Sequence, residues 1–189
     1  MAVTRMMTVP TSLLRVDPSI ARQSPKGYSH DDLRRIASTV PLVYEKMGQG
    51  WTEADFQRAR QSNDPQEKML GQTYQTLWRD PAASQSLHAH PTQQSLEVDA
   101  GNHRVRAAQD VGTPAMPVYV TAENAQHLNL TESACEEQLR LEGNEHLSAT
   151  QRQFDTDREL TAEVTASNDW GRQEGTIWSR EEASRERHE

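Results

Sequence analysis

The segment from Leu96 to Val120 constrains the fold of this chain more than any other stretch. It reads LEVDAGNHRVRAAQDVGTPAMPVYV. Alternating apolar residues predict a strand over Ser95–Asp99, and MPVYV is the most apolar strand candidate in the chain. Between them, Gly101 opens a helix and Gly112 ends it, because glycine tolerates the backbone conformations that such ends require. The turn from strand to helix is therefore the best-defined local structure in the sequence.

Composition limits what the rest of the chain can be. The 189 residues allow one domain with a tail, and 34% of them are apolar, so a core requires those residues to be concentrated. A single cysteine, Cys135, excludes an internal disulfide and a cysteine-based zinc site. No apolar run reaches the length of a membrane span, and the N-terminus lacks the apolar core of a secretory signal. We therefore expect a cytoplasmic protein without a transmembrane segment.

Charge is distributed unevenly along the chain. Residues 1–110 carry 13 basic and 12 acidic side chains, whereas residues 111–189 carry 7 and 16. The first part can meet a phosphate ligand, and the last part repels nucleic acid at long range. Of the 20 basic residues 17 are Arg, whose planar fork suits phosphate. A coding bias toward Arg explains the same count.

Other elements follow from apolar spacing and capping residues. The patterns predict a strand over 6–16, helices over His30–Thr39, from Thr52 and over Pro65–Leu77, a short strand over Ser86–Ala89, and a helix from Thr121 to Leu128. From Asn129 onward the sequence is polar, acidic and free of proline, with a helix expected over 131–142. We expect residues 1–128 to form the domain, with a helical insertion at about 41–83, and residues 129–189 to form an acidic helical or partly mobile extension.

The turn at Gly101 predicts an anion site. The first N–H groups of a helix lack backbone partners, and the helix dipole favours negative charge there. Asn102, His103 and Arg104 lie in the first turn, and Arg106 follows within one more turn. We therefore predict that these residues, with the Gly101 backbone, bind the phosphate of a nucleotide. His103 is in addition a candidate acid or base, since imidazole titrates near neutral pH; the alternative is a simple phosphate donor or a surface residue.

Acidic side chains precede this turn. Glu97 and Asp99 alternate onto one face of their strand, opposite Leu96 and Val98. Asp99 ends the strand beside the predicted anion site, where it can hold a Mg²⁺ that bridges to phosphate. The alternative for Asp99 is a turn or helix cap. His88 and His90 also alternate onto one face, but the sequence offers no third metal ligand beside them.

Here the sequence resembles a known superfamily. Asp99-Ala100-Gly101-Asn102-His103-Arg104-Val105-Arg106-Ala107-Ala108, then Gly112, then Pro117-Val118-Tyr119-Val120, resembles the ParB/sulfiredoxin signature of a G-x-H-R turn, an "RAA" helix, a glycine and a "vPv-v" strand. The N-terminal part resembles the same superfamily, with a strand at Val9–Val16, an Arg-bearing loop at Arg22 and a short helix at Asp31–Val40. The resemblance covers about residues 1–40 and 84–128.

The resemblance implies a small α/β domain with a mixed sheet that binds nucleotide or nucleic-acid phosphate at 101–104, with Arg22 as a second phosphate contact. It also implies nuclease or nucleotide-hydrolysing activity, with His103, Asp99 and Glu97 as catalytic candidates. Sulfiredoxin chemistry requires a Cys before His-Arg, and this chain has Asn102 there. The acidic extension also lacks the basic helix of chromosome-partition members.

Length and acidity add a narrower resemblance, to plasmid fertility-inhibition factors that block DNA transfer through a type IV secretion system. The implied chemistry is Mg²⁺-dependent ATPase and DNase activity, with ATP or another nucleotide and the transferred single strand as ligands. No G-x-x-x-x-G-K-[S/T] motif occurs, so such an ATPase is not of the P-loop kind.

Two alternatives remain open at this stage. The first is a non-catalytic interaction protein that blocks a secretion coupling protein through residues 129–189. The second is a nucleotide-gated DNA clamp.

Overall fold

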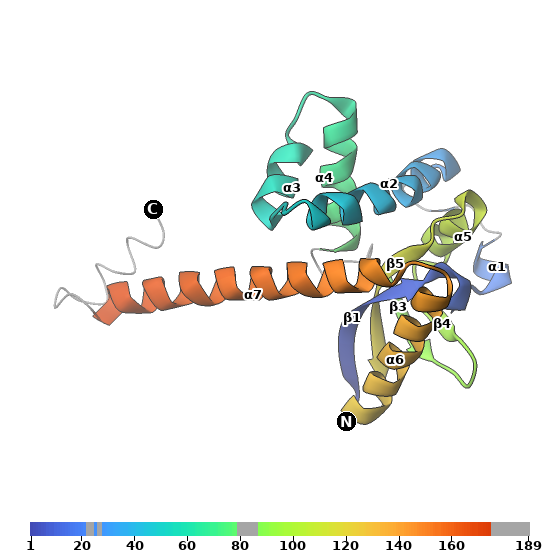
Figure 1. The fold of residues 1–189 in the computed structure, drawn as a ribbon. Coiled ribbons are helices and arrows are strands. Elements are labelled where there is room, and N and C mark those ends of the chain that lie inside the picture. The colour runs from blue at the N-terminus through green and yellow to red at the C-terminus, as the bar shows by residue number, and fades with distance from the viewer. Residues whose placement is uncertain (22–24, 26–27, 79–86, 175–189) are drawn as a thin grey trace. The chain divides into compact units, whose positions relative to one another are not determined.

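A mixed five-stranded sheet organises the chain in a computed structural model, which describes residues 1–21, 25, 28–78 and 87–174 (Figure 1). The strand order is β1-β5-β3-β4-β2. Strand β5 (Ala115–Ala122) pairs antiparallel with β1 (Val3–Pro10) and parallel with β3 (His88–Pro91). Strand β4 (Leu96–Ala100) pairs antiparallel with β3 and parallel with β2 (Leu14–Arg15). The α/β fold with a mixed sheet, predicted from the sequence, is confirmed.

The opening segment differs from the single strand expected over 6–16. Strand β1 ends at Pro10, a short 3-10 helix spans Thr11–Leu13, and β2 follows. The Thr11 N–H donates to the Pro114 carbonyl, just before β5, at 3.0 Å. Beyond Thr11 the chain no longer pairs with β5, and β2 pairs with β4 instead. A short helix, α1 (Pro18–Ala21), then occupies part of the expected loop.

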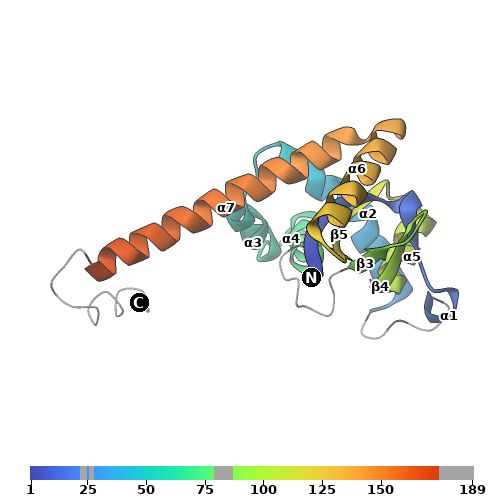
Figure 2. The ribbon, with the colours of Figure 1, turned by 90° about the horizontal axis from the view of Figure 1, so that it is seen from below.

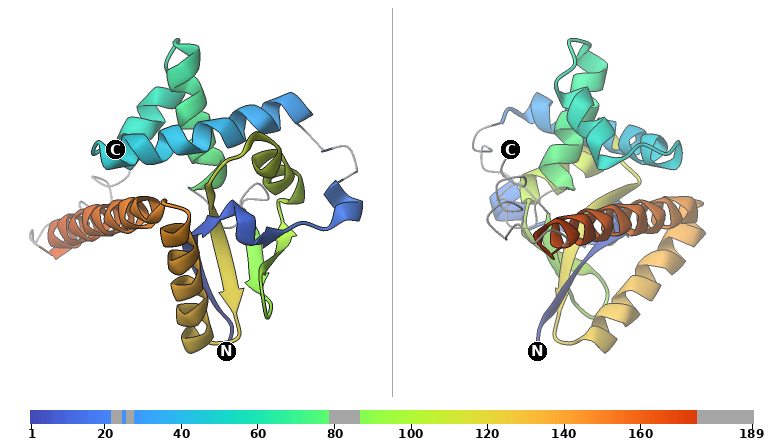
Figure 3. Two further views of the ribbon diagram at one scale, coloured as in Figure 1. Left: turned by 45° about the vertical axis from the view of Figure 1, so that its right-hand side comes forward. Right: turned by 90° about the vertical axis from the view of Figure 1, so that its left-hand side faces the viewer.

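Helices cover both faces of the β1–β5 pair. Arg5 of β1 donates to Asn129 at 2.9 Å and pairs with Glu132 at 3.2 Å, both on α6 (Ala125–Leu141). Thr8 of the same strand instead bonds to Tyr44 at 3.0 Å, on α2 (His30–Gly48). Residues three apart in a strand point to opposite faces. Helix α6 therefore lies along β1 and β5 on one face, as Figure 3 shows, and α2 packs on the other.

Helix α2 is longer than the sequence predicted, because it continues through Pro41 to Gly48 instead of ending near Thr39. A proline inside a helix removes one N–H and leaves the carbonyl four residues earlier unpaired. That carbonyl belongs to Ala37, and the buried hydroxyl of Thr113 donates to it at 2.9 Å. Beyond the proline, Val43, Tyr44 and Met47 continue the buried stripe.

The next two helices begin where the sequence predicted. Thr52 and Asp55 form a reciprocal capping box at the start of α3 (Glu53–Arg60), and Asp64 caps α4 (Pro65–Leu77). Large buried aromatic side chains pack here: Phe56 stacks on Tyr74 at 4.5 Å between ring centroids, and Trp78, just after α4, meets Tyr44 of α2 edge-on at 5.4 Å. Residues 41–78 are mainly helical, as the sequence predicted, and comprise the second half of α2 with α3 and α4. That they form an insertion into the domain stays a prediction.

The C-terminal helices differ from the predicted boundaries. Thr121 lies inside β5, and Asn124 caps α6 instead, with its side chain accepting from the His127 N–H at 2.7 Å. Helix α6 runs through the boundary expected at 128/129. Helix α7 (Glu145–Glu174) follows, and the chain divides into compact units at 1–151 and 152–189. In the first unit, Trp78 Nε1 donates to Gln151 at 2.7 Å.

We predict that Thr113→Val destabilises the fold by about 1–3 kcal/mol, because it leaves the Ala37 carbonyl buried without a donor. Urea unfolding followed by circular dichroism measures this change. Thr39→Val is the matched control: the Thr39 hydroxyl donates to the Arg35 carbonyl at 2.7 Å, but that carbonyl belongs to a regular helical turn and keeps its backbone partner.

A second substitution isolates the cause. Pro41→Ala restores an N–H that can reach the Ala37 carbonyl, so Thr113→Val should cost less in the Pro41→Ala background than in the parent chain. An equal cost in both backgrounds would show that Thr113 acts through packing and not through this hydrogen bond.

Candidate functional site

The turn into α5 (Asn102–Val111) is held by packing as well as by backbone conformation. Gly101 adopts φ +96°, and a Cβ at this position would lie 2.3 Å from Leu87 Cδ2, which is buried. Asn102, expected to face a phosphate, is buried, and its side-chain oxygen accepts from the Asp17 N–H at 2.8 Å. Asn102 therefore fastens the segment before α1 to the start of α5.

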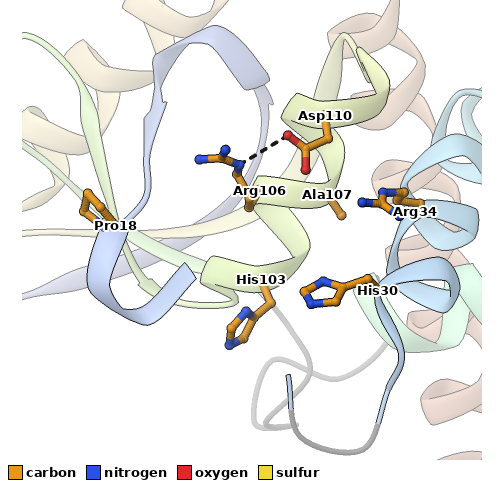
Figure 4. Close-up of a pocket in the computed structure, with 7 residues that line it drawn as sticks. All are labelled: Pro18, His30, Arg34, His103, Arg106, Ala107 and Asp110. Atoms are coloured by element: carbon orange, nitrogen blue, oxygen red, sulfur yellow. Dashed lines mark hydrogen bonds and ion pairs between the residues drawn. The ribbon is translucent and has the colours of Figure 1, made fainter. Parts of the chain in front are cut away.

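The side chains of α5 point to different sides of the helix. His103 and Arg106 line a pocket of about 460 Å³. Helix α1, which lies beside α5 in Figure 2, contributes Pro18 to this pocket. Helix α2 contributes His30 and Arg34, and Ala107 and Asp110 of α5 complete the lining (Figure 4). The pocket thus brings two histidines and two arginines together from two helices.

Helices α2 and α5 run in the same direction along this pocket. His30 opens α2, and His103 lies in the first turn of α5. Arg34 and Ala107 follow about one turn further, and the Thr113 hydroxyl, just beyond the end of α5, bonds to Ala37 one further turn along α2. Both positive helix ends therefore lie beside the pocket. The acidic side chains nearby are already paired, Asp110 with Arg106 at 3.2 Å and Asp31 with Arg34 at 3.3 Å.

Those two ion pairs leave both arginines able to bind a ligand. The arginine side chains are about half exposed, and exposed ion pairs one helical turn apart contribute only about 0.3–0.5 kcal/mol to stability. A phosphate can therefore replace either carboxylate at small cost. The pocket therefore has a basic lining in a chain of net charge −8.

Arg104 does not line this pocket. Its guanidinium lies 5.5 Å from the centre of the Tyr28 ring. Burial lowers the pKa of Arg104, and the charge interaction and the hydrogen bond with the Tyr28 side chain offset this effect only in part. Among the described residues, Arg104 Nε has no hydrogen-bond partner. Arg104 is thus a half-buried cation. It follows His103 directly in α5 but does not share the pocket that His103 lines.

Glu97 and Asp99 lie on the exposed face of β4, with Leu96 and Val98 buried beneath them, as the alternation predicted. The two Asp99 oxygens lie 2.8 and 3.0 Å from His90 Nδ1, and His90 Nε2 lies 3.9 Å from Glu97. Asp99 is thus oriented by its neighbour on β3 and not by the start of α5.

This arrangement fits Mg²⁺ poorly. Magnesium requires near-octahedral oxygen ligands, and the Asp99 carboxylate is already occupied by an imidazole. Within the described ranges, no group of three or more His, Cys, Asp or Glu side chains is placed to hold a metal ion. Asp99 as a metal ligand therefore stays a prediction.

Sequence reasoning missed His30 and Arg34. They lie some 70 residues before His103 in the sequence, and only the parallel packing of α2 on α5 brings them together. Their one sequence signal is that basic residues share the first turns of a capped helix. Arg22, the other predicted phosphate contact, lies outside the described residues.

Cys135 is buried in α6. Burial, with smaller contributions from Glu132 and Glu136, raises the pKa of its thiol to about 12. A thiol with so high a pKa stays protonated near neutral pH and is a poor nucleophile. None of the described helices has the length and apolar character that a bilayer crossing requires.

Comparison of the chain with protein-family models, with curated proteins and with solved structures finds no match. The ParB/sulfiredoxin resemblance therefore rests on the residues quoted for it alone.

We predict that Gly101→Ala destabilises the fold more than Gly112→Ala. Both glycines have positive φ, so both substitutions incur backbone strain of order 1 kcal/mol. A Cβ at Gly112 meets nothing within 4 Å, whereas one at Gly101 displaces Leu87. Thermal unfolding of the two variants compares them directly. Equal losses would show that Leu87 adjusts freely and that the glycine serves only the turn.

Proposed function

We propose that this chain binds a phosphate-bearing ligand, a nucleotide or a nucleic-acid strand, in the pocket between α2 and α5, and hydrolyses a bond of that phosphate. The observation that carries the proposal is the convergence of His30, Arg34, His103 and Arg106 on one pocket at two helix N-termini. Arginine forks and helix N-termini are the groups that bind phosphate in proteins generally.

The hydrolytic part of the proposal has narrower support. His103 is half-buried at the mouth of this pocket, and no hydrogen bond to it is found within the described part of the chain. It is therefore available to a ligand. The resemblance to ParB-like nucleases and to plasmid fertility-inhibition factors adds ATP or the transferred DNA strand as the proposed ligands.

We predict that ATP binding, measured by isothermal titration calorimetry, weakens about 10-fold or more in Arg34→Ala. A hydrogen bond to a charged group contributes about 1.5–3 kcal/mol, and 1.4 kcal/mol corresponds to a factor of ten. Arg35→Ala is the matched control, because Arg35 lies on the same helix, pairs with Asp32 as Arg34 pairs with Asp31, and does not line the pocket.

Salt gives a second readout of the same site. Added NaCl should weaken binding in the parent chain and weaken it less in Arg34→Ala, since the variant has lost one of the screened charges. ATP binding that is equally weakened in Arg34→Ala and Arg35→Ala would place the ligand elsewhere.

The alternative function, inhibition of a secretion coupling protein by residues 129–189, is not tested well by deleting that whole segment. Helix α6 buries Leu128, Cys135 and Leu139 and packs on β1 and β5, so removing it would expose the sheet. A chain ending at Gln151 keeps the first compact unit. Loss of transfer inhibition with ATP binding intact in that chain would favour the interaction function.

A further inference from the structure

The two histidines of the pocket come from different helices and face the same space. His30 begins α2, and His103 lies one residue into α5. Both line the same pocket, and Figure 4 shows the His30 ring extending from α2 toward His103. The charged groups around them are Arg34 and Arg106, with Asp31 and Asp110 as the partners of those arginines.

We infer that His30 and His103 form an acid–base pair for hydrolysis of a phosphodiester, with Arg34 and Arg106 holding the phosphate between them. This inference rests on the proposed function and extends it, because it adds a catalytic residue and selects a substrate class. Imidazole is suited to both roles, since its neutral form accepts a proton and its charged form donates one near neutral pH.

The step balances without a further reactant. A water oxygen bonds to phosphorus while the water proton passes to the neutral imidazole. The bond from phosphorus to the leaving oxygen breaks, and the second, protonated imidazole gives its proton to that oxygen. The products are a phosphomonoester and an alcohol, and the two imidazoles return to their starting states by proton exchange with solvent.

The substrate class follows from the leaving group. A sugar alkoxide is a strong base and leaves readily only when it is protonated, so an acid placed opposite a base benefits a phosphodiester most. When ATP is hydrolysed at its γ-phosphate, ADP leaves through its β-phosphate oxygen. That oxygen is a weak base, so its departure gains little from an acid. A pocket with two imidazoles on one phosphate site therefore suits a nucleic-acid strand better than a nucleoside triphosphate.

The test compares two substrates that differ in the leaving group. Cleavage of oligothymidylate releases a sugar alkoxide, whereas cleavage of the p-nitrophenyl ester of thymidine 5′-monophosphate releases the stable p-nitrophenolate. We would measure kcat for both in Mg²⁺ buffer with the full chain, His30→Gln and His103→Gln. His146→Gln is the control, because His146 is exposed on α7 and does not line the pocket.

We expect one variant, which lacks the base, to lose about 10²- to 10⁴-fold in kcat on both substrates. The other, which lacks the acid, should lose a comparable factor on oligothymidylate and less than about 10-fold on the phenyl ester. A histidine that only binds phosphate would not distinguish the two leaving groups. His30→Gln with kcat within about threefold of the parent chain on both substrates would overturn the pair.

Binding separates this inference from the proposed function. Anisotropy of labelled oligothymidylate measures binding in every variant, and glutamine keeps a hydrogen-bond donor in place of each imidazole. A parent chain that binds the strand without cleaving either substrate overturns the pair and leaves the phosphate pocket standing. A parent chain that binds neither oligothymidylate nor ATP overturns both.

Discussion

The packing of α2 along α5 decides where every basic side chain of the pocket lies. One buried hydrogen bond, from the Thr113 hydroxyl to the Ala37 carbonyl, joins the two segments at the end away from the pocket. That carbonyl is free because Pro41 lacks the N–H that would otherwise reach it. A residue that normally breaks a helix thus creates the acceptor that anchors this helix to its neighbour. With that register fixed, His30 lies opposite His103 in the pocket.

The turn at Gly101 and Asn102 holds the start of α5 in place by packing and hydrogen bonding, whereas the phosphate motif suggested that both residues face a ligand. Gly101 is required by its positive φ and by the buried Leu87 side chain, and Asn102 is turned inward to hold Asp17. The strand before the turn carries its own polar set, with His90 between Asp99 and Glu97 on the exposed face of the sheet. The predicted site residues that the structure describes therefore fall into separate groups, and of these residues only His103 and Arg106 line the α2–α5 pocket.

Local signals in the sequence were enough for most elements. The starts of α2, α3 and α4, which Ser29, Thr52 and Asp64 cap, and the glycines around α5 depend on short-range features, and each lies where the sequence pattern predicted. The predicted end of α2 was wrong because Thr113, which supplies the hydrogen bond that Pro41 lacks, lies 72 residues beyond Pro41 in the sequence. His30 and Arg34 were missed for the same reason, since a pocket between helices depends on tertiary packing that no local pattern records. Similarly, the pairing of Asp99 with His90 depends on strand register, which brings β3 beside β4.

Titration of ATP into ¹⁵N-labelled protein, followed by amide chemical shifts, tests residue by residue the proposal that phosphate binds between the starts of α2 and α5. We expect the largest shifts on His30–Arg34 and His103–Ala107, while the amides of Glu97, Asp99 and α6 change little. Saturating shifts centred on the exposed face of β3 and β4, or none at the two helix N-termini, would contradict it.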